Sequence, residues 1–517
     1  MIRNLLSVGG LTLLSRITGF ARDVLMGAAL GGGAMADAFT VAFRLPNHFR
    51  AIFGEGAFNA AFVPSFTRTL AQDGRQEARL FSGRVYILLF LSQIVLLALA
   101  LVFMPQMVDL LAPGFRQDPA KFDLAVSLTR ITFPYLMLIT LVTLQSGSLN
   151  AEGRFMTAAF APVLLNLSMI AALAVSFLFP NAAYAAAWGV VISGVLQFLL
   201  VEIAAWRADI GPLPARPQWD GHISDFFKAL APAVLGSAGV QIAIFADTII
   251  GSYLPTGGPA SIYYADRIYQ LPIGVIGIAA GTVLLPEMSR AFAKGDDEGA
   301  ARAQNRTMAL TIALSAPFFV AFMLIPDLIM RAAFLRGAFT AQNAAASADV
   351  LQAYSVGLLA VVLIASARAS FQARGDTQTP MIVSLAAVAI NVAIKLALYK
   401  SFGAPGLALA TAIGAWINFG SLVFLAWRAG YMKPSDMLGR MIAATACGAT
   451  ALGLAIAPVE PLVRKLPPLA QLAILGAIGA AAYIGGFFAG GKIVGLDLSI
   501  LRNAITKRKS RARGERA

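Results

Sequence analysis

Charged side chains interrupt two strongly apolar segments near the start of the chain. Between Ser15 and Pro64 the apolar background carries Arg16, Arg22, Asp23, Asp37, Arg44, Arg50 and Glu55. An ionised side chain at the centre of a bilayer costs about 2.5 to 3.5 kcal/mol even on lenient insertion scales. Snorkelling to the headgroup layer poorly explains basic groups spaced through two helices. The arginines are therefore expected to line a wet, positively charged cavity.

A further arginine completes the pattern. Arg267 lies in the second half of the chain at nearly the position that Arg44 takes in the first, and each precedes a proline, Pro272 and Pro46, at which we expect a helix break. Several guanidinium groups together bind phosphate in a bidentate manner, which predicts a polyanionic cargo such as a phosphate or pyrophosphate ester. The alternative is structural, because intramembrane charges often pair: the arginines would pair with Asp23, Asp37 and Asp266.

The composition predicts a membrane protein that crosses the bilayer many times. Of 517 residues, 58% are hydrophobic and 13% charged, and the mean hydropathy is +0.74. The net charge of +14 follows from basic residues on one side of a membrane and requires no nucleic acid. One cysteine, Cys447, excludes an intramolecular disulfide framework, and two histidines offer little for a metal site. No enzyme motif holds in its structural context, so we expect no catalytic residue, metal or cofactor.

Apolar segments long enough to cross a bilayer predict an all-α protein with about fourteen transmembrane helices. Their expected limits are 4–26, 34–54, 83–111, 124–149, 156–179, 184–206, 224–253, 262–285, 307–334, 345–370, 379–400, 405–428, 437–457 and 468–491. With the N-terminus inside, the inner segments hold 26 basic residues and the outer segments seven. This excess predicts that both termini are cytoplasmic.

An internal repeat divides the chain. The same interval separates Pro64 from Pro286 and Gly153 from Gly375, and the sequence Trp-Arg-Ala at 206 recurs after almost that interval at 427. We expect two parallel six-helix lobes, with a substrate site between them. The predicted parts are 1–207, 208–430, two additional helices within 431–494, and a basic cytoplasmic tail, 495–517.

Three groups of motifs resemble those of the MurJ (MviN) family of lipid II flippases. The first is LLSR with GFARD at residues 13–23; the second is DAF, FRLPN, EGAF and FVP between residues 37 and 64. The third is ADR at 265–267 with GTVLLP at 281–286. The resemblance implies the multidrug/oligosaccharidyl-lipid/polysaccharide exporter superfamily and alternating access. It assigns substrate binding to Arg16, Arg22, Arg50 and Arg267, with supporting positions Ser15, Asp23, Asp37, Arg44, Glu55 and Asp266. Residues 431–494 would form a groove for the lipid tail.

One position departs from this pattern. Some relatives bind sodium, and the matching positions are Asp247, Asn391, Lys395, Leu407 and Thr411. Lys395 stands where sodium-binding members have a carboxylate. Its ammonium group would repel Na⁺ and could pair with Asp247, so we expect no sodium dependence and take the membrane potential as the driving force.

The resemblance predicts an inner-membrane flippase that carries lipid II, a polyprenyl-pyrophosphate-linked muropeptide, to the outer leaflet, in contact with membrane lipids and cell-wall synthesis proteins. One alternative is a polysaccharide-lipid flippase or a cation-coupled multidrug exporter, although the latter favours an acidic, aromatic cavity. Another is a scaffold for cell-wall enzymes that has lost flipping.

Overall fold

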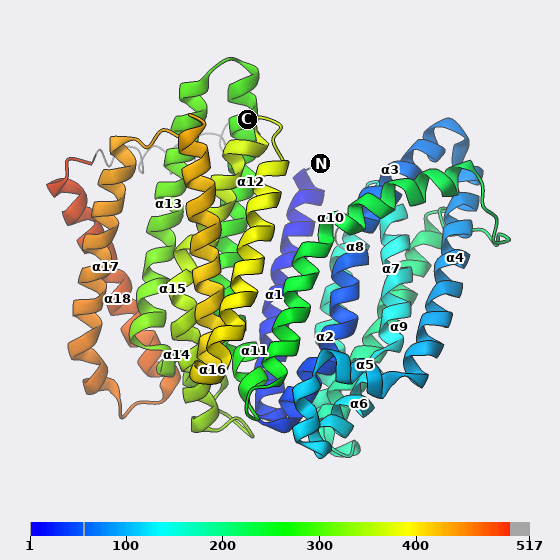
Figure 1. Ribbon diagram of the computed structural model, residues 1–517, viewed down its shortest axis with the longest axis horizontal. Helices are drawn as coiled ribbons and strands as arrows, with labels where there is room; N and C mark the ends of the chain where they lie inside the picture. The colour runs from blue at the N-terminus through cyan, green and yellow to red at the C-terminus, as the bar shows by residue number, and fades with distance from the viewer. Residues whose placement is uncertain (1, 55–56, 497–517) are drawn as a thin grey trace. The chain divides into compact units, whose positions relative to one another are not determined.

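The computed structural model describes residues 2–54 and 57–496, and every regular element in them is a helix (Figure 1). The elements of the first half are α1 (Ile2–Leu30), α2 (Ala34–Gly54), α3 (Ala57–Gln72), α4 (Gly74–Val102), α5 (Met104–Leu111), a 3₁₀ turn (Pro113–Gln117), α6 (Pro119–Thr132), α7 (Pro134–Ala151), α8 (Phe155–Ala174), a 3₁₀ turn (Ser176–Leu178) and α9 (Ala182–Arg207). The second half contains α10 (Gly221–Ser252), α11 (Gly258–Pro272), a π-helical turn (Ile273–Gly277), α12 (Ile278–Ala293), α13 (Asp297–Leu324), α14 (Pro326–Phe334), α15 (Ala341–Gln372), α16 (Gln378–Arg428), α17 (Asp436–Val463) and α18 (Pro468–Ile493).

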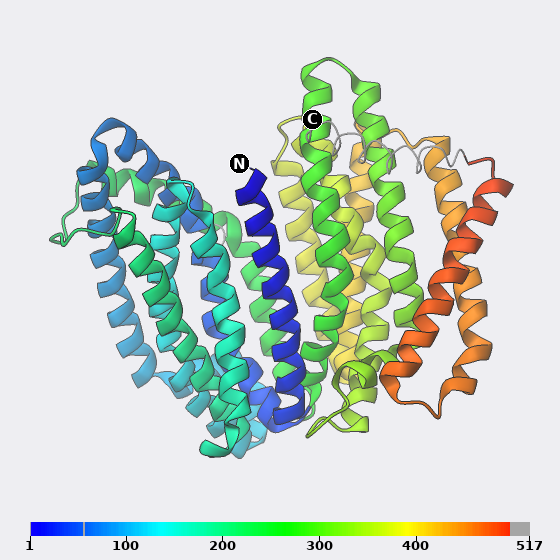
Figure 2. The same ribbon diagram turned by 180° about the vertical axis from the view of Figure 1, so that it is seen from behind.

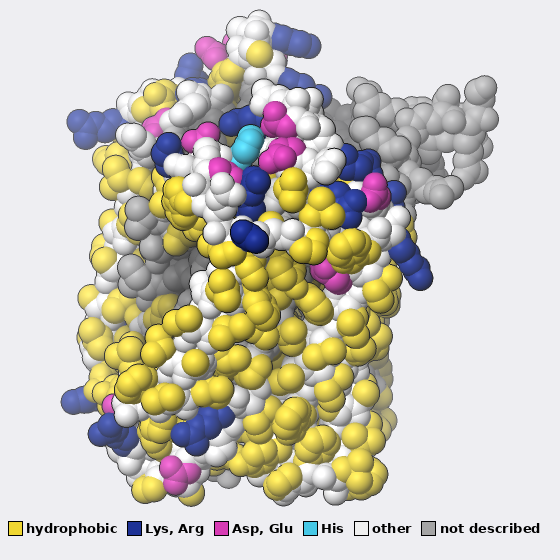
Figure 3. Space-filling view, turned by 90° about the vertical axis from the view of Figure 1, so that its right-hand side faces the viewer, with side chains coloured by type: hydrophobic (Ala, Val, Ile, Leu, Met, Phe, Trp, Pro, Cys, Tyr) yellow, Lys and Arg dark blue, Asp and Glu magenta, His cyan; other side chains and the backbone are white. Residues whose placement is uncertain are grey.

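The predicted all-α, polytopic membrane fold is confirmed. In the described part of the chain, ten helical ranges are long and apolar enough to cross a membrane, and these ranges correspond to eleven of the predicted spans. The other three predicted spans, 4–26, 34–54 and 224–253, lie on α1, α2 and α10. Figure 3 shows a face on which hydrophobic side chains form a broad band, with charged side chains gathered at its two ends. This distribution is expected of a surface that faces lipid.

Glycine and proline separate two predicted spans that otherwise form one long helix. Within α16, Gly403 has φ 57° and ψ −139°, and Pro405 follows two residues later. That backbone conformation is accessible to glycine and strained for other residues, and proline lacks an N–H for the helix ladder. The expected boundary between 379–400 and 405–428 is therefore where the helix is interrupted.

Proline also divides several predicted spans, although not at every expected position. Pro105, Pro134 and Pro326 each stand in the first turn of a new helix, where the missing N–H costs nothing. Pro272 ends α11 and is followed by the π-helical turn. The predicted break at Pro46 is wrong, because α2 continues through it from Ala34 to Gly54. In this case the freed carbonyl group does not end the helix.

The element bounds repeat at the interval found in the sequence. Helix α4 ends at Val102 and α13 at Leu324, and the interval between these ends is the one that separates Pro64 from Pro286. The short helices that follow, α5 and α14, also match, as do α9 and the second part of α16. One difference is that Pro134 separates α6 from α7, whereas the corresponding α15 is continuous.

The chain forms two compact units. Unit 1 consists of Met1–Arg267, Phe334–Ala346 and Lys395–Leu407, and unit 2 of Ile268–Ala333, Ser347–Ile394 and Ala408–Ala517. Helices α11, α15 and α16 thus contribute to both. These units group chain segments by their contacts, so the division into 1–207, 208–430, 431–494 and 495–517, which follows the repeat, stays a prediction.

Each unit has its own packing. In unit 1, α1 packs on α8, and α10 packs on α3. Phenylalanine side chains form a buried aromatic cluster between α3, α4 and α10: Phe58, Phe62, Phe66, Phe81 and Phe226. In unit 2, α13 packs on α17, and α17 and α18 lie side by side in both ribbon views (Figures 1 and 2).

Close backbone contact at Gly83 generates a test of unit 1. A Cβ atom on Gly83 of α4 would lie 2.0 Å from the Leu213 carbonyl oxygen, and the Leu213 N–H donates to the Arg79 carbonyl group. We expect Gly83→Ala to lower the melting temperature in detergent, because overpacking costs about 1–3 kcal/mol. Gly420→Ala in α16 is the control, since a Cβ atom there meets open space and alanine favours the helix. Equal melting temperatures for the Gly83 variant and the unmodified chain would contradict the packing.

Candidate functional site

The Asp23 carboxylate on α1 is the centre of a buried ionic cluster in unit 1. Its Oδ1 atom accepts hydrogen bonds from Arg22 Nε at 3.0 Å and Nη2 at 2.7 Å. The Tyr263 hydroxyl group on α11 donates to the same oxygen at 2.9 Å. On the other side, Arg267 Nε lies 3.8 Å from Asp23 Oδ2. The predicted association of Arg22 and Arg267 is thus mediated by one carboxylate.

Asn166 holds the other end of the Arg22 guanidinium group. From α8, its Oδ1 accepts from Arg22 Nη1 at 2.9 Å. Its Nδ2 donates to the Ser15 carbonyl group at 2.9 Å and to Thr18 Oγ1 at 3.1 Å. A Cβ atom on Gly19 would lie 3.4 Å from this Nδ2, so the glycine leaves room for the amide.

The two arginines differ in access. The Arg22 side chain is 10% exposed, whereas that of Arg267 is 37% exposed. The Arg267 guanidinium carbon lies 4.6 Å from the centre of the Tyr263 ring, a favourable cation–π geometry. Arg22 is therefore a positioning group that orients Asp23, and Arg267 presents its charge to the surroundings.

The charge of the cluster is not balanced by its own residues. Arg22, Asp23 and Arg267 together carry one surplus positive charge, and Arg16, which precedes Arg22 on α1, is exposed. A phosphate oxygen is a good partner for a guanidinium group, since charge-assisted hydrogen bonds are about twice as strong as neutral ones. The arrangement is chemically suited to recruit an anion without covalent chemistry.

Asp37 has a different role from the one predicted. Its side chain is fully buried, and its Oδ2 and Oδ1 accept from the backbone N–H groups of Gly257 at 2.8 Å and Ala260 at 2.9 Å. Lys121 Nζ lies 3.7 Å from Oδ2. A carboxylate at these N–H groups stabilises the start of α11, so Asp37 fixes the helix that carries Tyr263 and Arg267.

Two other predicted cations are also held by partners within unit 1. Arg44 Nη1 donates to Thr248 Oγ1 on α10 at 3.0 Å. The Lys395 ammonium group, on a side chain only 3% exposed, contacts the Asp247 carboxylate. The expected Lys395–Asp247 pair is thus present, with the lysine as the more buried member.

The remaining predicted positions are dispersed or lie outside the description. Asp266 is half-buried and adjoins Arg267 along α11. Asn391 and Thr411 belong to unit 2, where Asn391 packs against Gly414, and Leu407 is buried in unit 1. Glu55 and the side chain of Arg50 lie outside the described residues. The roles assigned to all of these positions stay predictions.

Sequence reasoning missed three residues of the site. Asn166 and Tyr263 bind members of the ionic cluster, and Lys121, assigned only to an outer loop, is 5% exposed beside Asp37. A lone amide in an otherwise apolar span was the available signal for Asn166, because a polar group in a membrane helix needs a partner. Tyr263 precedes Arg267 by four residues, which places both on one helix face.

Comparisons with known proteins identify the family. The family model described as "Lipid II flippase MurJ" matches residues 26–465. A "Probable lipid II flippase MurJ" of Rhizobium meliloti (strain 1021) is 39% identical, with 100% of this chain and 98% of that protein covered.

Solved structures support the fold. A structure described as "Lipid II flippase MurJ, inward closed conformation" gives a TM-score of 0.79 at 23% identity, over 96% of this chain and 99% of that chain. An inward-facing multidrug resistance MATE family transporter of the MOP superfamily gives 0.67 at 16% identity, over 84% and 99%. Taken with the match over residues 26–465, the full-length identity places this chain in the lipid II flippase MurJ family, whose members are membrane transporters rather than enzymes.

Proposed function

We propose that this protein moves lipid II from the cytoplasmic to the outer leaflet of the bacterial inner membrane. The observation that carries the proposal is the Asp23 cluster, in which two guanidinium groups share one carboxylate inside apolar helices. Family membership supports the substrate, and the surplus positive charge is suited to the pyrophosphate of a polyprenyl-linked muropeptide. The same charge disfavours a cationic drug as cargo.

The geometry suggests an order of contacts. Arg267, with its side chain 37% exposed and only 3.8 Å from the carboxylate, is the first group to meet the pyrophosphate, together with the exposed Arg16. Arg22 stays on Asp23 and Asn166. A bound phosphate would then take Arg267 away from Asp23, so that substrate binding is an exchange of ionic partners rather than the burial of a new charge.

Alternating access is proposed as the mode of movement, supported by the fold shared with transporters. The chain passes from unit 1 to unit 2 between Arg267 and Ile268. Pro272 and the π-helical turn Ile273–Gly277 follow directly, and both features weaken the regular hydrogen bonding of a helix. Movement of the units would thus bend α11 next to the substrate-binding arginine.

The driving force is proposed to be the membrane potential. Charge asymmetry places both termini in the cytoplasm, and moving a negative charge out of a negative interior releases about 2.3 kcal/mol per charge per 100 mV. The Lys395–Asp247 pair supplies a fixed positive charge to Asp247, and a cation therefore has little reason to bind there.

Replacing Arg267 tests the anion site. Arg267→Ala should reduce flipping at least tenfold, because a hydrogen bond to a charged group contributes about 1.5–3 kcal/mol, while Arg22 still pairs with Asp23. The measurement is accumulation of lipid II in the inner leaflet when the variant is the only copy in the cell. Arg267→Lys should recover part of the activity, since it restores the charge but not the planar fork.

The matched control is Arg331→Ala. Arg331 is an arginine of α14 whose side chain is 44% exposed and pairs only with Asp327 one turn away. It should flip lipid II normally. Normal flipping by Arg267→Ala, with equal amounts of protein in the membrane, would refute the role of the cluster; failure to accumulate lipid II when the protein is depleted would refute the function itself.

Ion replacement tests the role of Lys395. In proteoliposomes, transport by the unmodified protein should proceed at the same rate when Na⁺ is exchanged for K⁺ at constant ionic strength. Lys395→Asp exchanges the ammonium group for a second carboxylate beside Asp247, and this variant should become stimulated by Na⁺. Na⁺-dependent transport by the unmodified protein would show that the pair does not replace the ion.

Removing the potential tests the energy source. Valinomycin with equal K⁺ on both sides of the vesicle should slow outward movement of the anionic headgroup, because the charge no longer moves down a potential. An unchanged rate at a collapsed potential would exclude this source of energy.

A further inference from the structure

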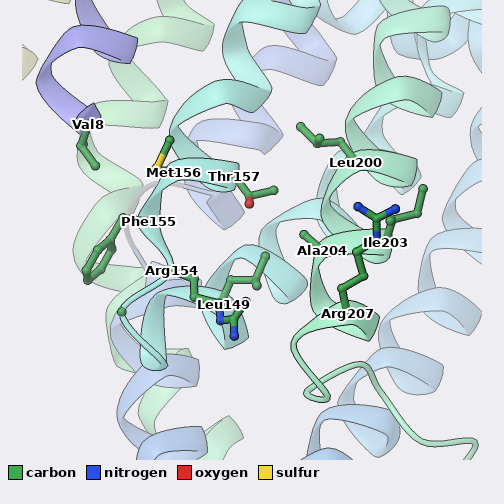
Figure 4. A pocket seen from close by; sticks show the side chains of 11 residues that line it. Val8, Leu149, Arg154, Phe155, Met156, Thr157, Leu200, Ile203, Ala204 and Arg207 are labelled. Atoms are coloured by element: carbon green, nitrogen blue, oxygen red, sulfur yellow. The ribbon is translucent and has the colours of Figure 1, made fainter. Parts of the chain in front are cut away.

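A second basic cavity lies in unit 1, on elements that do not carry the Asp23 cluster's carboxylate. It has a volume of about 470 Å³ and is lined by the turn before α8, the first residues of α8 and the last two turns of α9 (Figure 4). Arg154 and Arg207 enter it from these two sides, and Leu200, Ile203 and Ala204 supply an apolar wall. The cavity thus joins two guanidinium groups to a hydrophobic surface.

The neighbouring carboxylates do not neutralise these arginines. Glu152, two residues before Arg154, accepts from Arg75 Nη2 at 2.8 Å. Asp209, two residues after Arg207, pairs with Arg79. Among the described residues that line the cavity none is acidic, and within residues 2–54 and 57–496 neither Arg154 nor Arg207 has an ion pair. The cavity therefore has two uncompensated positive charges.

The surroundings are those of a membrane boundary. The side chains of Phe155, Met156 and Ile203 are 44%, 54% and 49% exposed, and that of Trp206 is 48% exposed. Tryptophan is typical of the headgroup level. Further exposed apolar side chains continue from the cavity along α9, toward its N-terminus: Leu199, Leu196, Val195 and Ile192.

We propose that this cavity binds an anionic phospholipid of the cytoplasmic leaflet. Its phosphate lies between Arg154 and Arg207, and an acyl chain follows the exposed apolar side chains of α9. Basic pockets at the cytoplasmic ends of membrane helices bind such headgroups, with about 1 kcal/mol for each basic residue. The assignment depends on the cytoplasmic orientation within the proposed function but not on lipid II transport.

The second repeat lacks the same combination. At the repeat interval, Asp376 corresponds to Arg154, and Arg428 corresponds to Arg207 in the recurring Trp-Arg-Ala sequence. Asp376 accepts from the Thr379 backbone N–H at 3.0 Å, and this bond lowers its pKa, so it is ionised at neutral pH. A carboxylate at this place repels a phosphate, and the lipid site therefore belongs to the first repeat alone.

The nearest arginine of the second repeat is also engaged elsewhere. Arg374, two residues before Asp376, lies over the rings of Phe292 and Tyr431, with its guanidinium carbon 4.2 and 4.3 Å from their centres. Cation–π contacts of this kind hold a guanidinium group against the ring faces. Arg374 therefore does not take the place of Arg154.

Native mass spectrometry of the full-length protein tests the proposal. The detergent-solubilised protein is titrated with dioleoylphosphatidylglycerol, and separately with dioleoylphosphatidylcholine. The unmodified chain should bind the phosphatidylglycerol more tightly. Arg154→Gln and Arg207→Gln should each weaken this binding roughly fivefold, and the double variant roughly thirtyfold, from the contribution of one basic residue. Arg428→Gln, the repeat-related control, should bind as the unmodified chain does.

Further arms separate the possible outcomes. Ala204→Glu places a carboxylate in the cavity wall and should weaken phosphatidylglycerol binding as the arginine substitutions do, with gel filtration confirming the fold. Inorganic phosphate at millimolar concentration should not displace the lipid, since it lacks the acyl chain; displacement would refute the lipid assignment. Equal binding of both lipids, or equal loss in Arg428→Gln, would also overturn it. None of these readouts involves transport, so failure of flipping would leave the site's test intact.

Discussion

An ionised group persists inside an apolar helix bundle only where another group neutralises or hydrates it, and this requirement organises unit 1. Asp23 meets it for two arginines at once, with the shorter contacts to Arg22 at 2.7 and 3.0 Å and the longer one to Arg267 at 3.8 Å. Because a fully balanced pair would have little attraction for an anion, the excess of one guanidinium group over carboxylates is the property on which binding depends.

Helix α11 connects this electrostatic requirement to the architecture. Asp37 fixes its first N–H groups to α2, and the Tyr264 hydroxyl group donates to the Gly31 carbonyl group at 3.1 Å. Tyr263 and Arg267 are thereby held against α1, and the helix loses regular geometry only beyond Pro272. Position at the rigid end and freedom beyond it are both consequences of where the polar contacts stop.

Much of the fold and part of the site followed from the sequence, for identifiable reasons. Span limits depend on hydrophobic runs, and glycine and proline mark boundaries such as Gly403, so a single sequence contains them. Arg22, Asp23 and Arg267 were recognisable because charge in an apolar span is costly. The partners were not: Asn166 is far from Arg22 along the chain, and only the folded structure shows that it completes the guanidinium's hydrogen bonds. The use of Asp37 as a helix cap was hidden for the same reason, since its hydrogen-bond donors are backbone groups.

The fate of nearby carboxylates distinguishes the two basic sites of unit 1. At the Asp23 cluster the carboxylate is a member of the site, and a ligand must compete with it; binding is then reversible and sensitive to movement of α11. At the α8–α9 cavity, Arg75 and Arg79 engage Glu152 and Asp209, and the inward-facing arginines keep their full charge. A transporter must release its cargo, whereas a lipid that only contacts the protein need not leave. Partial compensation in the first place and none in the second are consistent with these different requirements.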